Sequence, residues 1–196
     1  MKFNAYLLFG APGSGKGTQG KILGTVPGLF HVACGEVFRS IDLKSEIGQV
    51  FLRYSSKGEL VPDDFTVRLW KEHIDGLVHT NRFDPEHNTL VLDGIPRNIH
   101  QAKMIAEHIH VRRVFHLTCP DRTKLVERLK RRALKDNRLD DASDETIRHR
   151  LEIYEAESKP VLQFYGKDLI SHIDASQSAI AVLDNILQVI MGLDKK

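Results

Sequence analysis

The sequence predicts a three-layer α/β/α domain built on a five-stranded parallel sheet. The chain has 196 residues, which is the size of one ordinary domain. Short apolar runs rich in Val, Ile, Leu and Phe alternate along it with helix-length amphipathic segments. This alternation is typical of a parallel sheet with helices on both faces. No internal repeat or low-complexity linker divides the chain, so we expect a single domain over residues 1–196.

Apolar runs predict the strands, and amphipathic segments between them predict the helices. The strands are expected at Asn4–Phe9, Leu29–Val32, Thr89–Leu92, Val111–Thr118 and Leu169–Ile173, with Leu29–Val32 the least marked. The helices are expected near Lys16–Gly24, Glu36–Ile41, Ser45–Ser56, Asp63–Val78, Ile99–His108, Arg122–Leu134, Asp144–Gly166 and Gln177–Met191.

Three places depart from this regular alternation. Pro160 lies inside the last-but-one helical segment and should kink or divide it, because proline removes a helical hydrogen bond. Ala33–Val61 and Lys135–Asp141 are excursions from the sheet. Excursions at strand ends are where folds of this class bind ligands.

Composition excludes several classes of protein. Lys and Arg total 28 against 26 Asp and Glu, a formal charge of +2, so the partner should be small and not a nucleic acid. No apolar run is long enough to cross a bilayer, so no membrane partner is expected. The N-terminus does not resemble a signal peptide, so we expect a cytoplasmic protein. Two cysteines are too few for a disulfide framework or a four-thiolate zinc site.

A glycine-rich loop follows the first predicted strand. It reads Gly10-Ala-Pro-Gly-Ser-Gly-Lys-Gly-Thr18 and opens a helix. Glycines let backbone N–H groups curl around a phosphate, the helix N-terminus favours the anion, and Lys16 can reach the terminal phosphates. A hydroxyl residue usually follows the lysine of such loops directly, but here Gly17 stands before Thr18. The sequence therefore predicts a P-loop fold that binds a nucleotide.

A carboxylate and a set of arginines stand at other predicted strand and helix ends. Asp93 follows the third strand, where a P-loop fold holds a carboxylate near nucleotide-bound magnesium; a turn cap is the alternative. Arginine forks neutralise crowded phosphate oxygens, which transfer between two nucleotides requires. Arg39 and Arg97 follow the second and third strands, and Arg128 lies one helical turn before Arg132.

Five motifs, in order along the chain, resemble those of the nucleoside monophosphate kinases, and of the adenylate kinases in particular. They cover most of the chain: Gly10–Thr18, Ala33–Arg39, Gly58–Pro62, Leu92–Arg97 with Gln101, and Asn137–Asp141 with Arg150. The resemblance implies reversible phosphoryl transfer from MgATP to AMP, giving two ADP, and a monomer. It also implies a monophosphate-binding insertion at about residues 33–61 and a lid at about residues 131–141.

The resemblance assigns roles to residues at the matching positions. The catalytic residues would be Lys16, Asp93, Arg97, Arg132, Arg138 and Arg150. ATP would bind to Gly13, Ser14, Gly15, Lys16, Gly17, Thr18 and Arg128. AMP would bind to Cys34, Arg39, Glu59, Leu60, Val61, Gly94, Ile95, Pro96, Arg97, Gln101, Arg138 and Arg150. Mg²⁺ would come with ATP, near Thr18 and Asp93. The lid is of the short type, so zinc is not expected. Apart from the resemblance, Asp140 and Asp141 follow Arg138 and are expected to pair with the lid arginines, to cap the next helix, or to do both.

The acceptor nucleotide is less strongly indicated than the reaction. Gln101 can both donate to and accept from the edge of adenine, which favours AMP. Cys34 stands where adenylate kinases usually have threonine and the kinases of UMP and CMP have alanine, and Ile95 replaces a more common phenylalanine. A UMP/CMP kinase therefore stays an alternative, as does a nucleotide-dependent switch. Cys34 would be either a thiol sensitive to oxidation or a buried inert one.

The basic stretch Lys130–Lys135 has a second interpretation, as a nucleic-acid-binding face. No aromatic residue lies between Phe115 and Tyr154, so base-stacking side chains are missing there. The ten histidines are scattered, and none is assigned chemistry.

Overall fold

A central five-stranded sheet organises the protein. The computed structural model describes residues 2–136, 141 and 143–193. The strand order is β2-β3-β1-β4-β5, and every neighbouring pair is parallel, which confirms the predicted fold class. The strands are β1 (Phe3–Phe9), β2 (Leu29–Ala33), β3 (Thr89–Asp93), β4 (Ile109–Thr118) and β5 (Ile170–Asp174).

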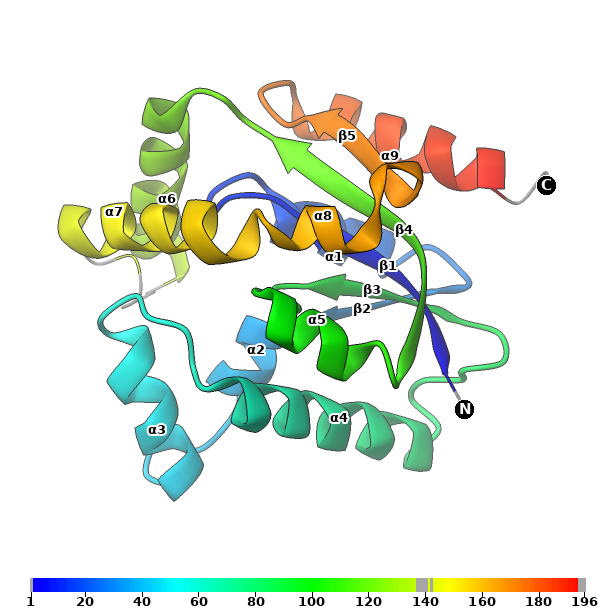
Figure 1. Ribbon diagram of the computed structural model, residues 1–196, viewed down its shortest axis with the longest axis horizontal. Coiled ribbons are helices and arrows are strands. Elements are labelled where there is room, and N and C mark those ends of the chain that lie inside the picture. The colour runs from blue at the N-terminus through cyan, green and yellow to red at the C-terminus, as the bar shows by residue number, and fades with distance from the viewer. Residues whose placement is uncertain (1, 137–140, 142, 194–196) are drawn as a thin grey trace.

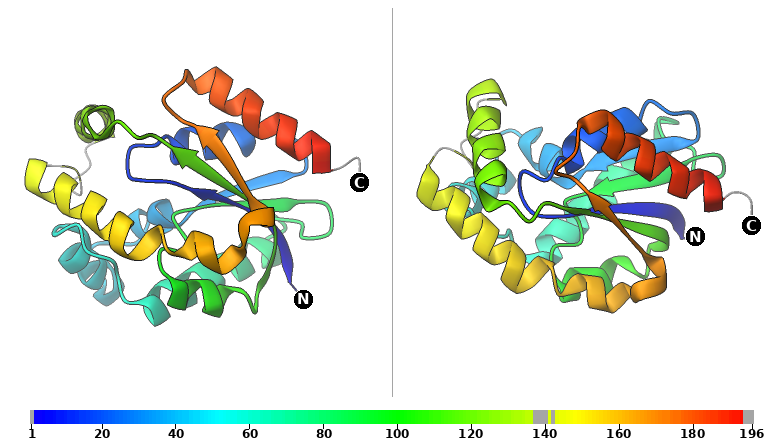
Figure 2. Two further views of the ribbon diagram at one scale, coloured as in Figure 1. Left: turned by 45° about the horizontal axis from the view of Figure 1, so that its top comes forward. Right: turned by 90° about the horizontal axis from the view of Figure 1, so that it is seen from above.

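Helices cover both faces of this sheet (Figures 1 and 2). They are α1 (Lys16–Leu23), α2 (Cys34–Arg39), α3 (Glu46–Ser55), α4 (Asp63–His79), α5 (Ile99–Ile105), α6 (Arg122–Asp136), α7 (Asp144–Ile153), α8 (Val161–Tyr165) and α9 (Ala179–Leu193). Because successive side chains of a strand point to opposite faces, a central strand between two helical layers is apolar throughout. This is why β1 reads as an apolar run instead of an alternating one.

Two hydrophobic clusters lie on the opposite faces of the sheet. On one face Leu7 belongs to a cluster with Trp70 of α4 and Ile105 of α5. On the other face the neighbouring Leu8 belongs to a cluster with Leu23 of α1 and Ile186 of α9. All six side chains are at most 2% exposed. Burial of this kind contributes about 1.5–3 kcal/mol for each large apolar side chain, and it fixes β1 between the two layers.

The first predicted excursion, Ala33–Val61, follows the carboxyl end of β2, whereas most of the second, Lys135–Asp141, lies outside the described residues. Helices α2 and α3 stand beyond the end of β2, and α6 and α7 stand beyond β4, at the left of Figure 1. Helices α6 and α7 have a small core of their own, made of Leu125, Leu129, Ile147 and Leu151. Helices α6 and α7 are therefore held largely by each other, whereas α2 belongs to the main core through Val37 and Phe38.

The segment from Asp144 is divided, as Pro160 predicts, but the irregularity begins earlier. Helix α7 ends at Ile153 and a π-helical turn over Tyr154–Ser158 follows it. The Lys159 N–H donates to the Tyr154 carbonyl at 2.8 Å, one residue further back than in an α-helix. Smaller differences are in the strand ends: Asp93 is the last residue of β3, β4 begins at Ile109, and β5 runs one residue later than predicted.

Candidate active site

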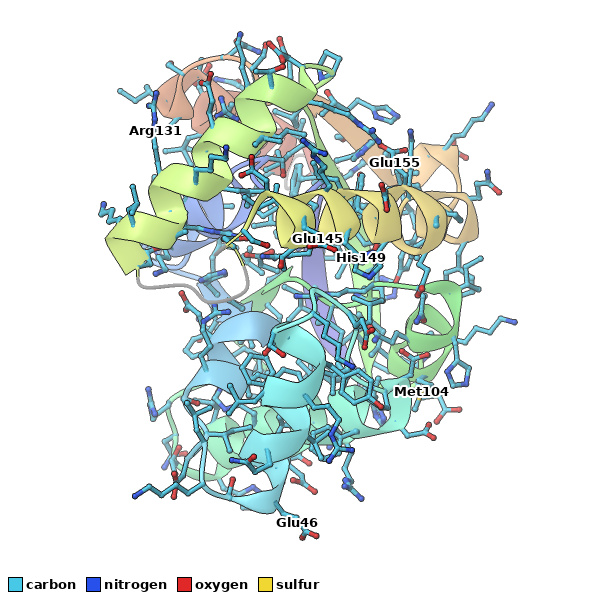
Figure 3. The ribbon with its side chains drawn as sticks, turned by 90° about the vertical axis from the view of Figure 1, so that its left-hand side faces the viewer. Glu46, Met104, Arg131, Glu145, His149 and Glu155 are labelled. Carbon is cyan, nitrogen blue, oxygen red and sulfur yellow. The ribbon has the colours of Figure 1, made fainter. Side chains whose placement is uncertain are left out.

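A cleft of about 820 Å³ opens at the carboxyl ends of the strands. Its walls are the loop after β1, the start of α2, the residues after β3, the inner faces of α6 and α7, and the loop between β5 and α9. Strand β1 has β3 on one side and β4 on the other, and the chain crosses to opposite faces at this point. A crevice at such a switch point is the usual ligand site of an open parallel sheet. Seen from the open side, α7 lies between α6 and α3 (Figure 3).

The glycine-rich loop forms the floor of the cleft, and its conformation depends on glycine. Gly13 has a φ of +82°, and a Cβ there would lie 2.8 Å from the Leu125 carbonyl oxygen. At Gly10 a Cβ would lie 2.5 Å from the Leu117 carbonyl oxygen. The loop is therefore packed tightly between the end of β4 and the start of α6. Helix α1 begins within this motif, at Lys16. The first N–H groups of a helix have no partner within it and can bind an anion.

Lys16 is held over this loop by backbone carbonyls. Its Nζ donates to Gly10 O at 2.7 Å and to Ala11 O at 3.1 Å. Burial lowers the pKa of the Lys16 ammonium to about 8; the carboxylate of Asp93 opposes that shift, and neighbouring arginines add to it. A buried cation among other cations is stabilised by an added anion, so this position favours phosphate.

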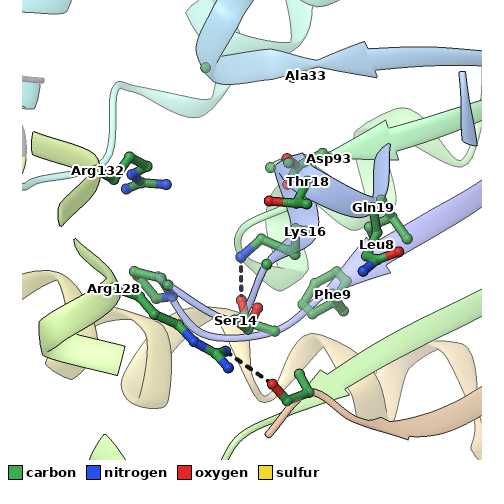
Figure 4. Close-up of a pocket in the computed structure, with 18 of the residues that line it drawn as sticks. Leu8, Phe9, Ser14, Lys16, Thr18, Gln19, Ala33, Asp93, Arg128 and Arg132 are labelled. Atoms are coloured by element: carbon green, nitrogen blue, oxygen red, sulfur yellow. Dashed lines mark hydrogen bonds between the residues drawn. The ribbon is translucent and has the colours of Figure 1, made fainter. Parts of the chain in front are cut away.

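Asp93 lies beside the start of α1. It ends β3, and its Oδ2 would be 3.5 Å from a Cβ built on Gly17, so the carboxylate lies within van der Waals contact of the first turn of α1. Thr18 lines the same cleft, and Figure 4 shows Asp93 and Thr18 close to Lys16. The carboxylate and the hydroxyl are thus brought together at one side of the phosphate loop.

Arginines reach the cleft from several elements. Arg39 ends α2, and Arg97 follows β3 with its Nε donating to Gly94 O at 2.9 Å. Arg128 and Arg132 project from α6 (Figure 4), and Arg150 projects from α7. All five line the cleft. Arg138 lies outside the described residues.

Arg128 is turned toward the loop that follows β5. Its Nη1 donates to Ala175 O at 3.0 Å, the contact that is dashed in Figure 4. The guanidinium plane is thereby fixed beside the wall formed by Ala175 and the residues after it. A planar cation held in this way can lie against a flat ring.

A single carboxylate orders two of the arginines. The Asp141 side chain is fully buried, and its Oδ2 accepts from Arg132 Nε at 2.9 Å and from Arg132 Nη2 at 2.6 Å. Its Oδ1 accepts from Arg150. Ser143 is the residue that caps α7, accepting from the Thr146 N–H at 3.1 Å. The predicted pairing of Asp141 with lid arginines is thus confirmed, while Asp140 lies outside the described residues.

A smaller recess of about 60 Å³ lies next to the cleft, and several of the same residues line both. Most of the residues expected to bind AMP line the recess: Cys34, Arg39, Glu59, Leu60, Val61, Gly94, Arg97, Gln101 and Arg150. Pro96 lines the cleft. Ile95 lines neither; its side chain is 2% exposed and belongs to the hydrophobic core.

The thiol of Cys34 is buried, at 3% exposure, as the first residue of α2. Burial raises its pKa to about 11, because the thiolate is disfavoured away from water, although nearby arginines act in the opposite direction. The structure therefore supports an inert thiol over one sensitive to oxidation.

Sequence reasoning missed part of the cleft wall. Ala175, Gln177 and Ala179 line the cleft at the end of β5, and Tyr154 and Ser158 line it from the π-helical turn. Small or neutral side chains carry no chemical signature, so no motif marks them. The position of 175–179 directly after a parallel strand is the signal that could have found them.

Among the residues that the structure describes, no helix is long and apolar enough to cross a membrane. Within the same residues, no group of three or more His, Cys, Asp or Glu side chains is placed to hold a metal ion.

Comparisons with known proteins identify the family. Residues 8–170 match the adenylate kinase family. An adenylate kinase from Porphyromonas gingivalis strain W83 is 38% identical over 172 residues, which cover 85% of this chain and 84% of the relative. An adenylate kinase from Thermobifida fusca is 35% identical over 86% of this chain and 88% of the relative. An adenylate kinase from a Cyanothece species is 34% identical over 94% of this chain and 93% of the relative. They do not favour a UMP/CMP kinase or a switch. The chain belongs to the adenylate kinase family of phosphotransferases.

Proposed function

We propose that this cleft carries the reversible transfer of a phosphoryl group from MgATP to AMP, giving two ADP. The observation that supports it best is that one continuous cleft is lined both by the phosphate loop and by arginines from α2, the β3 end, α6 and α7. A phosphate loop alone would suffice for one nucleotide. Cations on the opposite wall have a function if a second phosphate faces the first.

The triphosphate is proposed to lie over the loop and the start of α1. Backbone N–H groups there face the β- and γ-phosphates, Lys16 neutralises them, and Arg128 stacks on the adenine beside Ala175. The residues of this side are Gly13, Ser14, Gly15, Lys16, Gly17, Thr18 and Arg128.

Members of the family use ATP as its magnesium complex, and the residues beside the loop fit that ion. Mg²⁺ keeps several of its waters and prefers carboxylate and hydroxyl oxygens. Asp93 lies beside the start of α1, where its Oδ2 is 3.5 Å from the position of a Cβ built on Gly17, and Thr18 adds a hydroxyl nearby. Asp93 and Thr18 would therefore hold the waters of the ion. Bound there with ATP, Mg²⁺ supplies positive charge to the phosphate oxygens.

The monophosphate is proposed to lie on the opposite side, in the recess between α2, α4 and the residues after β3. Arg39 and Arg97 would bind its phosphate, and Gln101 would read its base. The remaining contacts would come from Cys34, Glu59, Leu60, Val61, Gly94, Pro96, Arg138 and Arg150, with Ile95 supporting the recess from the core. The recess is smaller than a purine, so segment 33–61 is proposed to move when AMP binds.

Catalysis needs no covalent intermediate, because a phosphate oxygen of AMP is itself the nucleophile. Lys16 and Arg97, with Arg132, Arg138 and Arg150, would hold both phosphates in line and stabilise the charge on the transferred group. Closure of the lid at about residues 131–141 would exclude water that otherwise hydrolyses ATP. One chain supplies every group named here, so the enzyme is proposed to act as a monomer.

The test is ADP formation from MgATP with AMP, UMP, CMP, dTMP or GMP as acceptor, against a reaction without acceptor. We expect rapid turnover with AMP. Preference for a pyrimidine nucleotide, or turnover that does not depend on an acceptor, would contradict the proposal.

Three variants test the assignments within the cleft. Lys16→Ala and Arg97→Ala should each lower kcat/KM by about a hundredfold or more, since each removes a positive charge that would stabilise the transferred phosphoryl group. Arg122→Ala is the matched control: this arginine is exposed at the start of α6 and does not line the cleft. Circular dichroism should show all three folded. Near wild-type activity of either cleft variant would refute its assignment.

A further inference from the structure

Asp63 forms a hydrogen-bonded group with the proposed base-reading residue, although it does not line the cleft or the recess. It is the first residue of α4, where a carboxylate is favoured by the helix dipole. Its Oδ1 accepts from Gln101 Nε2 at 2.8 Å and from Asn98 Nδ2 at 2.9 Å. Its Oδ2 is 3.0 Å from His100 Nδ1. The side chain is 21% exposed, so water does not replace these partners freely.

The amide of Gln101 is held from both of its ends. Its Nε2 donates to Asp63, and its Oε1 accepts from the Arg97 N–H at 2.8 Å. A carboxylate can only accept and a backbone N–H can only donate. A flipped amide would therefore place oxygen against oxygen and N–H against N–H in a side chain that is 1% exposed. Only one orientation of this amide satisfies its neighbours.

One N–H and one oxygen lone pair of the Gln101 amide have no partner among the described residues, and Gln101 lines the recess. An amide with a fixed orientation distinguishes 6-amino from 6-oxo purines. Adenine offers an amino donor at C6 and an acceptor at N1, whereas hypoxanthine offers an acceptor at C6 and a donor at N1. An amide with one fixed orientation can satisfy only one of these two patterns, because the other pattern requires the flipped amide.

We propose that Asp63 is a positioning residue that sets the orientation of the Gln101 amide and thereby the preference for 6-aminopurine over 6-oxopurine monophosphates. This inference rests on the proposed function, since it takes Gln101 to be the group that faces the acceptor base. Asp63 touches neither substrate nor the reacting atoms, so it should affect the KM of the acceptor and the choice of base, and leave kcat with saturating AMP nearly unchanged.

The test compares kcat/KM for AMP with kcat/KM for IMP in the wild type and in three variants. Asp63→Ala removes the acceptor and should lower the AMP-to-IMP ratio by about tenfold or more, through a higher KM for AMP. Asp63→Asn keeps an acceptor oxygen without the charge and should hold the ratio within about threefold. Asp64→Ala is the matched control, because it removes an exposed carboxylate from the same helical turn and should leave the ratio unchanged.

A second readout does not depend on activity. In ¹⁵N-edited NMR spectra, the two side-chain amide protons of Gln101, assigned with Gln101→Glu, should be separate in the wild type and in Asp64→Ala. They should shift and broaden in Asp63→Ala, where the amide can flip. If Asp63→Ala does not fold, Asp63→Leu, which has a similar volume and no acceptor, carries both measurements.

The outcomes separate the two proposals. If the wild type prefers AMP to IMP and both Asp63→Ala and its spectrum behave as wild type, Asp63 does not position Gln101, while the proposed function stands. A loss that falls on kcat for both acceptors equally, with the ratio kept, would also overturn the inference. If the wild type does not use AMP, the proposed function itself has failed.

Discussion

Replacing His116 by glutamine should remove a large part of the acid sensitivity of this protein. His116 lies on β4 and is 8% exposed. Its Nδ1 is 3.0 Å from Nδ1 of His172, and its Nε2 is 3.1 Å from the Tyr154 hydroxyl. Burial lowers the pKa of His116 to about 4, and the neighbouring His172 and Lys159 act in the same direction. The folded protein therefore keeps this imidazole neutral where an unfolded chain would protonate it.

The sign and size of the effect follow from that shift. The folded-state pKa lies below the unfolded one, so the stabilisation is complete above about pH 6.5 and is lost as the pH falls toward 4. With an unfolded pKa of 6.5 and a folded pKa of about 4, the loss is about 2 kcal/mol between pH 7 and pH 5, and about 3 kcal/mol by pH 4. The steepest slope corresponds to one proton, or about 1.4 kcal/mol for each pH unit.

Urea unfolding at a series of pH values measures this directly. The free energy of unfolding of His116→Gln is expected to fall less than that of the wild type between pH 7 and pH 5, with the difference near 2 kcal/mol. Any cost of the substitution that does not depend on pH cancels in this comparison. His110→Gln, an exposed position on the same strand, is the control and should follow the wild type. Parallel curves for His116→Gln and the wild type would refute the argument.

Three further predictions concern the cleft. A polyphosphate beside Lys16 should raise the pKa of this lysine from about 8. ATP binding should therefore take up a proton near pH 8.5 and weaken above that pH. Calorimetry in two buffers of different ionisation enthalpy measures the proton uptake, which Lys16→Met should lack. Because Cys34 is 3% exposed and Cys119 is partly exposed, a thiol reagent should label the native enzyme once, at Cys119. Cys119→Ser should abolish that labelling. Rapid labelling of this variant would contradict the assignment of Cys34 as an inert thiol. Asp141→Asn should lower the free energy of unfolding by about 2 kcal/mol. This is less than the 3–5 kcal/mol typical of a broken buried ion pair, because the Arg132 side chain is 30% exposed. An unchanged midpoint of urea unfolding would contradict this prediction.

The sheet and the phosphate loop could be predicted because their constraints are visible in the residue types of short segments. Leu7 and Leu8 are both buried because helices cover both faces, and that condition appears directly as an apolar run. Gly10 and Gly13 are required where a Cβ would meet a carbonyl oxygen, so the crowding is recorded by residue type. The atoms that impose these constraints, such as the Leu117 and Leu125 carbonyl oxygens, are distant in the sequence, but each constraint is visible in the residue type at its own position.

No pattern in the sequence predicts the side-chain contacts between residues that are far apart along the chain. Asp63 and Gln101 are separated by the whole of α4 and by β3, and nothing in the residue types shows that the carboxylate reaches the amide. His116 meets the Tyr154 hydroxyl at the start of a π-helical turn, which proline rules did not predict. These residues were available in the sequence, but their partners are chosen by tertiary packing.

The arginines of the cleft show how the two kinds of information combine. Their number and positions in the sequence predict an anion site. In the structure, Arg97, Arg132 and Arg150 lie near enough to Lys16 to help lower its pKa. Such a cluster is costly in a folded protein unless carboxylates offset it. The sequence allowed Asp141 to cap a helix, to pair with arginine, or to do both. In the structure Ser143 is the N-cap residue of α7, and the buried Asp141 carboxylate pairs with Arg132 and Arg150. The acidic residue thus keeps the cations in place in a protein whose substrates are polyanions.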